Sequence, residues 1–284
     1  MNWQSIFQAL NLKVINLSPI SGGDIHSAYR LHTAEKDYFL KLNQATALPL
    51  FESDADSLKA IAASHTIDCP QPLQLGTFDN HAYLLMEFLP LTAQGDDFQR
   101  GQAVAMMHHS LNPTGQFGWH QDNFIGHTPQ PNHWHDDWVT FYAEQRLRPQ
   151  LQLAQQNGAS RQLLKLGEQL IDQLSQFFTP YTPAPSLLHG DLWSGNSAFL
   201  TDGTPVVYDP ACYYGDRETD LAMTELFGGF SQAFYDGYHQ TFPIDAGYPQ
   251  RKPLYQLYHI LNHFNLFGGH YQQQALHIMQ SLLK

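Results

Sequence analysis

Short apolar runs alternate with polar turns over the first ninety residues of the chain, and one stretch among them has helical periodicity. The segments 14–20, 25–31 and 38–42 have the length and composition of strands, and the segment 84–89 has the continuous apolar character of a buried strand. Between these strands, apolar residues recur at the spacing of one helix face: Phe51, Ala55, Leu58, Ile61 and Ala62. The pattern predicts a small antiparallel sheet accompanied by one helix.

The pattern changes from about residue 96 onward, where helical periodicity dominates. Helices are expected over 96–111, 136–157, 160–178, 218–240 and 251–283. The expected fold class is therefore α+β, with a sheet-rich part over residues 1–90 and a mostly helical part over residues 91–284. A chain of 284 residues fits two such lobes better than one.

The segment 112–135 is long for a connection between helices and is rich in Gly, Pro, Asn, His and Trp. Structureless loops above about 12–15 residues are usually functional or disordered. The aromatic residues of this segment argue against disorder. We therefore expect it to pack over the substrate side of the site, and a loop that only braces the two lobes is the alternative.

A β-hairpin is predicted inside the helical part. The apolar runs 197–200 and 205–208 flank the pair Asp202-Gly203, and Asp-Gly between such runs is typical of a two-residue hairpin turn. With that turn, Asn196 lies directly opposite Asp209, at a Cβ separation of about 4.5–5.5 Å. Both side chains carry oxygen atoms, which are the ligands that Mg²⁺ prefers. The hairpin therefore predicts a magnesium site formed by Asn196 and Asp209.

The residues before this hairpin follow the catalytic-loop pattern of kinases. His189, Asp191 and Asn196 have the spacing His-x-Asp-x-x-x-x-Asn, in which Asp accepts the proton of the substrate hydroxyl and Asn holds a metal ion. Asp209 stands where kinases carry the second metal-binding residue. A single Asp or Asn is usually a turn residue, but four residues in register with the hairpin favour catalysis. Asp191 is the predicted base.

The sheet-rich part contains candidates for binding ATP. Gly22 and Gly23 lie in a predicted turn where backbone amides can approach phosphates, although most such turns only reverse the chain. Lys41 lies within an apolar strand, where a lysine is costly unless paired. It predicts a contact with the α- and β-phosphates, and a lysine that only snorkels to solvent is the alternative. Asp54 lies on the edge of the apolar helix face whereas Asp56 points away from it, so Asp54 is the predicted partner of Lys41.

The adenine ring of ATP is expected at the end of the buried strand 84–89. In kinases the segment that connects the two lobes receives adenine on its backbone groups. The corresponding residues here are Met86, Glu87 and Phe88.

The acceptor is expected to be a small or side-chain-attached hydroxyl compound. Only ten residues separate Asp209 from Asp220, and no Ala-Pro-Glu motif follows, so the chain lacks the longer segment on which protein kinases bind peptides. Asp220 instead begins a helix, where its carboxylate can accept hydrogen bonds from exposed N–H groups and tie back to the catalytic loop.

Composition and charge limit which classes of binding partner and which cellular compartment are expected. The net charge of −12 argues against nucleic acid or an anionic membrane as the main partner. No apolar run approaches the ~18 residues of a membrane span, and the first residues do not have the pattern of a secretory signal. With only two cysteines, Cys69 and Cys212, a cytoplasmic protein with reduced thiols is expected. We expect a monomer or a weak dimer.

These motifs resemble those of the fructosamine/ketosamine-3-kinase family, in the aminoglycoside-phosphotransferase-like branch of the protein-kinase fold. The matching pieces span nearly the whole chain, and the string His-Gly-Asp-Leu-Trp-Ser-Gly-Asn over 189–196 is the most specific of them. The resemblance implies a bilobal protein-kinase-like fold with a nucleotide-binding N-lobe and a catalytic C-lobe. By resemblance, Asp191 is the base, Asn196 and Asp209 hold Mg²⁺, and His189 and Trp193 lie on the substrate side. The family usually has Glu at the place of Asp54.

The resemblance also implies an activity. Members phosphorylate the O3 hydroxyl of ketosamines such as ribulosamine or fructosamine at the expense of ATP, and the unstable product releases the amine, so that amines and proteins are deglycated. Another aminoglycoside- or choline-type kinase is one alternative. A non-catalytic nucleotide-binding pseudokinase is the other, and the presence of Lys41, Asp191, Asn196 and Asp209 opposes it.

Overall fold

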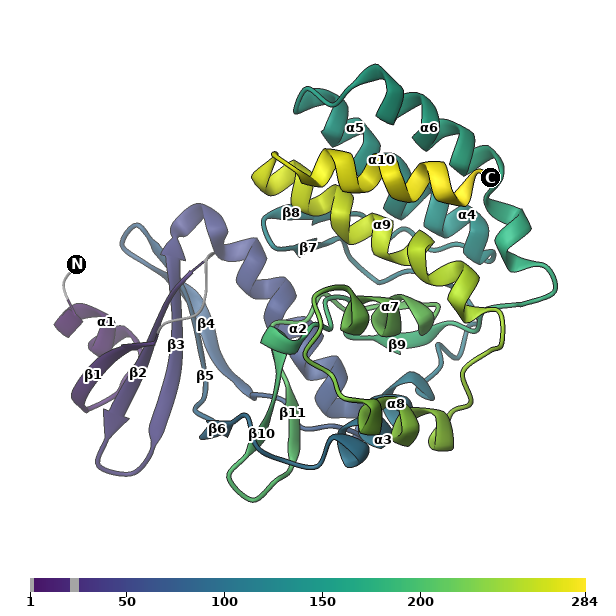
Figure 1. The fold of residues 1–284 in the computed structure, drawn as a ribbon. Coiled ribbons are helices and arrows are strands. Elements are labelled where there is room, and N and C mark those ends of the chain that lie inside the picture. Colours follow the sequence, from purple (N-terminus) through teal and green to yellow (C-terminus); the bar gives the residue numbers. More distant parts are fainter. Residues whose placement is uncertain (1–2, 21–25) are drawn as a thin grey trace.

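The structure is a computed structural model that describes residues 3–20 and 26–284. A five-stranded antiparallel sheet forms its N-terminal part, with the spatial order β1-β2-β3-β5-β4 (Figure 1). The strands are β1 (Val14–Ile20), β2 (Ser27–Thr33), β3 (Asp37–Gln44), β4 (Pro72–Phe78) and β5 (His81–Glu87). All four strands predicted in this part are present, and β4 is an additional one.

Two α-helices accompany this sheet, so the prediction of one helix was wrong. The missed helix is α1 (Trp3–Ala9), which buries Ile6 in an apolar cluster with Leu31, Leu40 and other residues of the sheet. Apolar residues do recur at helical spacing in this segment. A helix of seven residues is nevertheless too short to be stable by itself, and packing on the sheet stabilises it.

The predicted helix is α2 (Leu48–Ser64), which follows a short 3₁₀ turn (Ala45–Ala47). Its apolar face packs in the large core cluster, with Phe51, Ala55, Leu58 and Ile61 almost fully buried. The same cluster contains Leu84 and Met86 of β5 and extends into the helical part of the chain. One face of α2 therefore joins the sheet to the C-terminal part.

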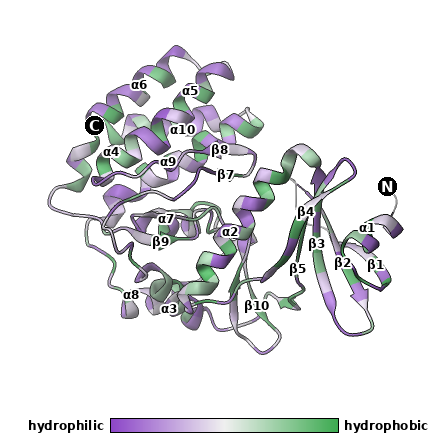
Figure 2. Ribbon diagram, turned by 180° about the vertical axis from the view of Figure 1, so that it is seen from behind, coloured by the Kyte–Doolittle hydropathy of each residue, from purple (hydrophilic) through white to green (hydrophobic). Residues whose placement is uncertain are grey.

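The C-terminal part is mostly helical (Figure 1). Its helices are α3 (Asp97–His108), α4 (Trp138–Tyr142), α5 (Arg148–Gln156), α6 (Arg161–Asp172), α7 (Glu218–Leu226), α8 (Gln232–Thr241), α9 (Tyr248–Phe267) and α10 (Tyr271–Leu282), with a π-helical turn (Ala143–Leu147) between α4 and α5 and short 3₁₀ segments at Leu174–Phe178 and Ser194–Asn196. Hydrophilic and hydrophobic residues alternate along the outer helices α6 and α10 in Figure 2, as expected for helices with one buried face. No helix of the described residues is long and apolar enough to cross a membrane.

Three small sheets complete the C-terminal part. The predicted hairpin is present as β10 (Ser197–Leu200) and β11 (Pro205–Val207), with β6 (Leu91–Thr92) pairing on the other side of β10. The other two sheets are β9 (Ser186–Leu188) with β12 (Tyr213–Gly215), and β7 (Asn123–Ile125) with β8 (Thr128–Gln130). The β9–β12 pair brings the segment before the catalytic loop beside the segment after Asp209.

Candidate active site

The hairpin that follows the catalytic loop has a different register from the predicted one. Ser197 faces Val207, and the backbone carbonyl of Asn196 accepts a hydrogen bond from the amide of Tyr208 at 3.0 Å. Asn196 therefore lies opposite Tyr208. The prediction that Asn196 is directly opposite Asp209 was wrong by one residue.

The turn chemistry explains the difference. A two-residue type I′ turn requires positive φ at both central residues, but only Gly203 has it here, at 92°. The Asp202 carboxylate accepts a hydrogen bond from the amide of Thr204 at 3.0 Å, and the amide of Gly203 donates to the carbonyl of Leu200 at 2.9 Å. The loop therefore contains three residues, which is the next most common hairpin connection.

The backbone conformation of Asp209 still brings this residue to Asn196, although the strand register differs by one residue from the predicted one. Its φ of 55° lies in the left-handed region, which Asp tolerates better than most residues. The side-chain amide of Asn196 then donates to the Asp191 backbone carbonyl at 3.0 Å, to the Asp191 carboxylate at 3.2 Å and to the Asp209 backbone carbonyl at 3.5 Å. The structure brings Asp191, Asn196 and Asp209 together, although not by the predicted strand pairing.

Lys41 joins this group from the sheet. Its Nζ lies 2.5 Å from a carboxylate oxygen of Asp54 on α2 and 2.6 Å from Oδ1 of Asp209. The predicted pairing of Lys41 with Asp54 is confirmed, and the shorter stem of Asp reaches the lysine. Burial alone lowers the pKa of Lys41, but Asp209 and Asp54 together outweigh it and raise that pKa, so the lysine is charged. A charge that is 93% buried is stabilised by two carboxylates here.

Asp209 is the more accessible of the two partners of Lys41. Its side chain is half-exposed, whereas that of Asp54 is largely covered. Burial acts to raise the pKa of Asp209, and the ion pair with Lys41 outweighs it and lowers that pKa. Asp209 is therefore an ionised carboxylate that still faces solvent.

Asp191 has the electrostatic environment of a base that works near neutral pH. Burial, together with the nearby Asp209 and Asp220 carboxylates, raises the pKa of Asp191 to about 7. The hydrogen bond from Asn196 acts in the opposite direction. A general base is most effective when its pKa lies near the working pH.

His189 is buried beneath Asp191 and does not reach the surface. Its Nε2 lies 3.0 Å from the Tyr208 carbonyl, to which it can only donate, and its Nδ1 accepts from the Asp191 amide at 3.2 Å. These partners define the tautomer with the proton on Nε2. Because both nitrogens are used, the structure gives His189 a positioning role rather than the predicted contact with substrate.

Asp220 fixes the backbone of the catalytic loop through hydrogen bonds. Its buried carboxylate accepts hydrogen bonds from the backbone amides of His189 at 2.7 Å and Gly190 at 2.9 Å, which confirms the predicted tie. It also contacts Nε2 of the buried His108 at 3.0 Å. A side chain at Gly190 would collide with the backbone carbonyl of Ala211, since an added Cβ would lie 2.1 Å from that oxygen. The loop is thus fixed by one carboxylate and one close backbone approach.

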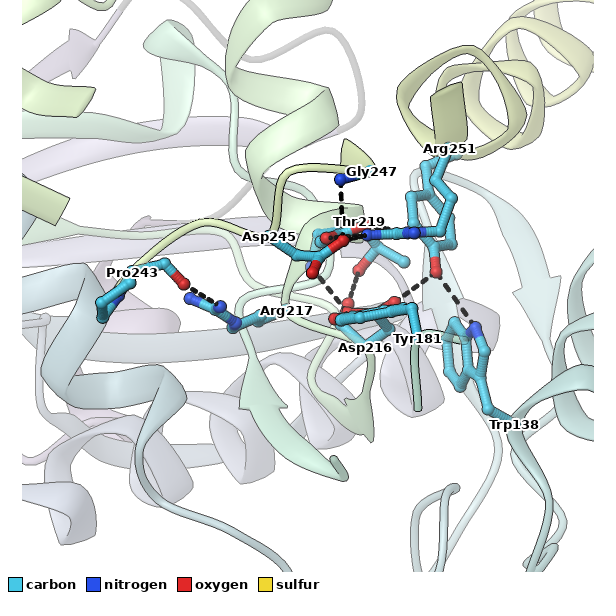
Figure 3. Close-up of polar contacts among 11 residues, drawn as sticks. Trp138, Tyr181, Asp216, Arg217, Thr219, Pro243, Asp245, Gly247 and Arg251 are labelled. Carbon is cyan, nitrogen blue, oxygen red and sulfur yellow. Dashed lines mark hydrogen bonds and ion pairs between the residues drawn. The ribbon is translucent and has the colours of Figure 1, made fainter. Parts of the chain in front are cut away.

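The start of α7, which carries Asp220, is held by a second buried polar network (Figure 3). Asp216 accepts hydrogen bonds from the hydroxyls of Tyr181, at 2.9 Å, and Tyr255. The Arg251 guanidinium makes two parallel hydrogen bonds to Glu218, at 2.7 and 2.8 Å. Bidentate pairs of this kind fix geometry as well as charge.

Some of the groups predicted to bind adenine are already engaged within the protein. Met86 is buried within β5, and the amide of Glu87 donates to the carbonyl of Gln71 at 3.0 Å, so that donor is already used. Phe88 lies just beyond β5, with the Arg30 guanidinium 4.3 Å from its ring centroid. The roles of Met86, Glu87 and Phe88 stay predictions. Gly22 and Gly23 lie outside the described residues.

The segment 112–135 braces α2, which favours the alternative over the expected substrate role. Trp119 donates its indole N–H to the carboxylate of Asp56 at 2.8 Å, and Nε2 of His120 lies 3.2 Å from the same carboxylate. Gly118 pairs with Tyr214, close to the catalytic hairpin. The sequence did not reveal that Asp56, on the face of α2 away from the apolar stripe, is the anchor for this brace.

The fold and the site together define a kinase-like phosphotransferase. A lysine of the five-stranded sheet, paired with a carboxylate of α2, meets the catalytic-loop motif of the helical part. The profile of the fructosamine kinase family matches residues 3–284, and the chain belongs to this family.

Named relatives agree with this membership. The chain is 46% identical to a protein of Synechocystis sp. named "Probable ketoamine kinase", over 99% of this chain and 97% of that protein. It is 38% identical to "Protein-ribulosamine 3-kinase, chloroplastic" of Arabidopsis thaliana, over 96% of this chain and 84% of that protein.

Solved structures have the same fold. The crystal structure of a "Putative fructosamine-3-kinase" from Haemophilus somnus superposes with a TM-score of 0.89 at 28% identity, over 99% of this chain and 98% of that one. The structure of a thermostable mutant of the aminoglycoside phosphotransferase APH(4)-Ia has a TM-score of 0.67 at 17% identity, over 98% of both chains. The predicted α+β, kinase-like fold is confirmed.

Proposed function

We propose that this protein is an ATP-dependent ketosamine 3-kinase. The observation that carries the proposal is the convergence of Lys41, Asp191, Asn196 and Asp209 in one site of a fructosamine kinase family member. Relatives named ketoamine kinase and ribulosamine 3-kinase support the substrate class. The division into an N-lobe over 1–90 and a C-lobe over 91–284 is part of this proposal.

In the proposed reaction, Asp191 accepts the proton of the O3 hydroxyl of the sugar. The O3 oxygen forms a bond to the γ-phosphorus of ATP, the bond between that phosphorus and the β–γ bridging oxygen breaks, and ADP leaves. Lys41 compensates the negative charge of the nucleotide phosphates. Asn196 orients the Asp191 carboxylate through the 3.2 Å hydrogen bond, and His189 orients the Asp191 backbone.

Asn196 and Asp209 are the residues that fit Mg²⁺. Magnesium in kinase sites is held by one or two protein oxygen ligands together with substrate phosphates and water, and it neutralises charge on the phosphates. The half-exposed Asp209 carboxylate has one oxygen on Lys41 and, among the described residues, no partner on the other. An ionised carboxylate with an open oxygen next to an amide suits that cation.

A substrate panel tests the proposal. We expect phosphate transfer from ATP to ribulosamine or fructosamine, with the phosphate on O3 when its position is assigned by NMR, and much slower transfer to aminoglycosides and choline. Preferred turnover of an aminoglycoside or choline would contradict the ketosamine assignment. Absence of magnesium-dependent turnover on every acceptor would favour a pseudokinase.

The magnesium ligand is tested by Asp209→Asn. We expect the magnesium concentration for half-maximal activity to rise by at least about tenfold, because an amide is a weaker ligand than a carboxylate. Asp202→Asn, at the exposed tip of the same hairpin, is the matched control and should leave the magnesium titration unchanged. Equal titration curves for Asp209→Asn and the unmodified enzyme would contradict the assignment.

The pH dependence of activity is tested on the unmodified enzyme. Because the pKa of Asp191 is raised to about 7, the carboxyl is protonated below that pH and cannot accept the hydroxyl proton. We expect kcat/KM for the ketosamine to fall about tenfold per pH unit below about 7 and to reach a plateau above it. A profile that stays flat down to pH 5 would rule out a base with a raised pKa.

A further inference from the structure

Five aromatic rings form a continuous line beside the catalytic loop, which we call the aromatic strip: Trp193, Phe227, His263, Phe267 and Tyr271. The ring centroids of Trp193 and Phe227 lie 6.4 Å apart, and those of Phe227 and His263 lie 4.9 Å apart. His263 in turn lies 5.6 Å from Phe267 and 5.1 Å from Tyr271. Figure 1 shows the loop after α7 and the turn between α9 and α10 on the side of the helical part that faces the sheet.

Two glycines fix the strip to the catalytic loop. An added Cβ at Gly229 would lie 2.3 Å from Cβ of Ser194, so the loop after α7 packs directly on the catalytic loop. An added Cβ at Gly195 would lie 2.2 Å from the Trp193 ring, which therefore rests on the bare backbone of Gly195. The strip thus begins two residues after Asp191 and is held there by backbone contacts.

The strip is mostly apolar and uncharged, and three of its rings are open to solvent. Trp193, Phe227 and Phe267 are 38%, 42% and 62% exposed. His263 donates from Nδ1 to the His259 carbonyl at 2.8 Å, and burial lowers the pKa of His263, so its ring is neutral. Large apolar side chains that lie exposed and in contact with one another usually mark a binding surface.

The lysine and the arginine of α9 are held in ion pairs at the start of that helix, whereas Phe267 lies at its end. Arg251 is paired with Glu218 and Asp245, and Lys252 is paired with Glu225. The electron-rich faces of the exposed rings of the strip can attract a cationic ligand.

We infer that the aromatic strip binds the substituent on the amine of the ketosamine, and that Phe227 and Phe267 determine which amines are preferred. The inference rests on the proposed function. In a ketosamine the amine is bonded to C1, two carbons from the C3 that carries the reacting hydroxyl. With that hydroxyl on Asp191, the cationic amine lies near Trp193, and its substituent extends along the strip. Ketosamines of aromatic or long apolar amines are the favoured class.

Two ketosamines that share one sugar test the inference, one made from methylamine and one from 6-phenylhexylamine, whose substituent is long enough to extend from Trp193 past Phe227 to Phe267. The measured quantity is the ratio of kcat/KM for the phenylhexyl compound to kcat/KM for the methyl compound. We expect this ratio to be at least about tenfold in the unmodified enzyme, and to fall at least about threefold in Phe227→Ala and in Phe267→Ala, because each variant removes one ring that the substituent contacts. Met106→Ala, an exposed apolar side chain on α3 away from the strip, is the matched control and should keep the ratio.

The possible outcomes distinguish a failure of the inference about the aromatic strip from a failure of the proposed function. Active variants that both keep the ratio of the unmodified enzyme would overturn the inference, as would a raised KM for ATP with an unchanged ratio. Turnover of no ketosamine at all would refute the proposed function on which the inference rests. Phe267 is the last residue of α9 and is mostly exposed, so Phe267→Ala should fold normally. The inference can therefore be tested with this variant even if Phe227→Ala folds poorly.

Discussion

Replacing Asp191 by Asn should lower kcat by at least about 10²-fold while ATP still binds. The amide of Asn cannot accept the hydroxyl proton at any accessible pH. Its oxygen can still accept the hydrogen bond that Asn196 donates to the native carboxylate at 3.2 Å, so the loop geometry should persist. The ion pairs of Lys41 with Asp54 and Asp209 do not involve residue 191 and should stay in place.

Steady-state kinetics with a ketosamine, together with calorimetric titration of ATP, would measure this effect. Asp236→Asn on α8, where the exposed side chain accepts a hydrogen bond from Gln232, is the matched control. Turnover that is unchanged in Asp191→Asn would remove this residue from the chemistry. Loss of ATP binding in the same variant would instead indicate that Asp191 acts on the nucleotide.

The sequence was sufficient for those parts of the fold in which local pattern and tertiary packing agree. The strands of the sheet and the α2 face containing Phe51 and Leu58 follow from periodicity, because the same spacing determines which side chains are buried. Helix α1 could not be predicted with the same certainty. It is too short for its own propensity to be decisive, and contacts with Leu31 and Leu40 stabilise it.

In the candidate site, too, some contacts were predictable from local sequence pattern and others were not. The Lys41–Asp54 pair was predictable, since a buried lysine needs a carboxylate and helix periodicity selected one of two candidates. The hairpin register was not, because the Asp202 side chain bonds to the Thr204 amide and favours a three-residue loop over the expected two-residue turn. The brace from Trp119 to Asp56 joins residues 63 positions apart, and such a contact has no local signature.

The contacts of Asp220 were predicted only in part. Its link to the catalytic loop was predicted, but its contact with His108 was not, because those residues lie 112 positions apart. His108 also lies 2.7 Å from the hydroxyl of Tyr238, so one buried carboxylate is joined to three elements of the structure. The histidine lowers the pKa of Asp220 against the effect of burial, so this carboxylate is ionised.

Replacing Asp220 by Asn should therefore lower both stability and activity. The amides of His189 and Gly190 donate to different oxygens of Asp220. An Asn side chain keeps only one acceptor oxygen, so its N–H₂ group must face one of these two amides, and that buried donor loses its partner. We expect the free energy of unfolding to fall by about 3–5 kcal/mol, the usual effect of breaking a buried charged network. Because the same bonds fix the backbone that carries Asp191, kcat should also fall at temperatures where the variant is folded.

Urea denaturation followed by circular dichroism, and kcat measured well below the melting temperature, would separate these two effects. Asp172→Asn, exposed at the end of α6, is the matched control and should change the unfolding free energy by less than about 0.5 kcal/mol. A variant that loses stability but keeps the full kcat would show that Asp220 supports the core without positioning the loop. A variant that keeps both would contradict the ionised, fully engaged carboxylate from which the prediction is derived.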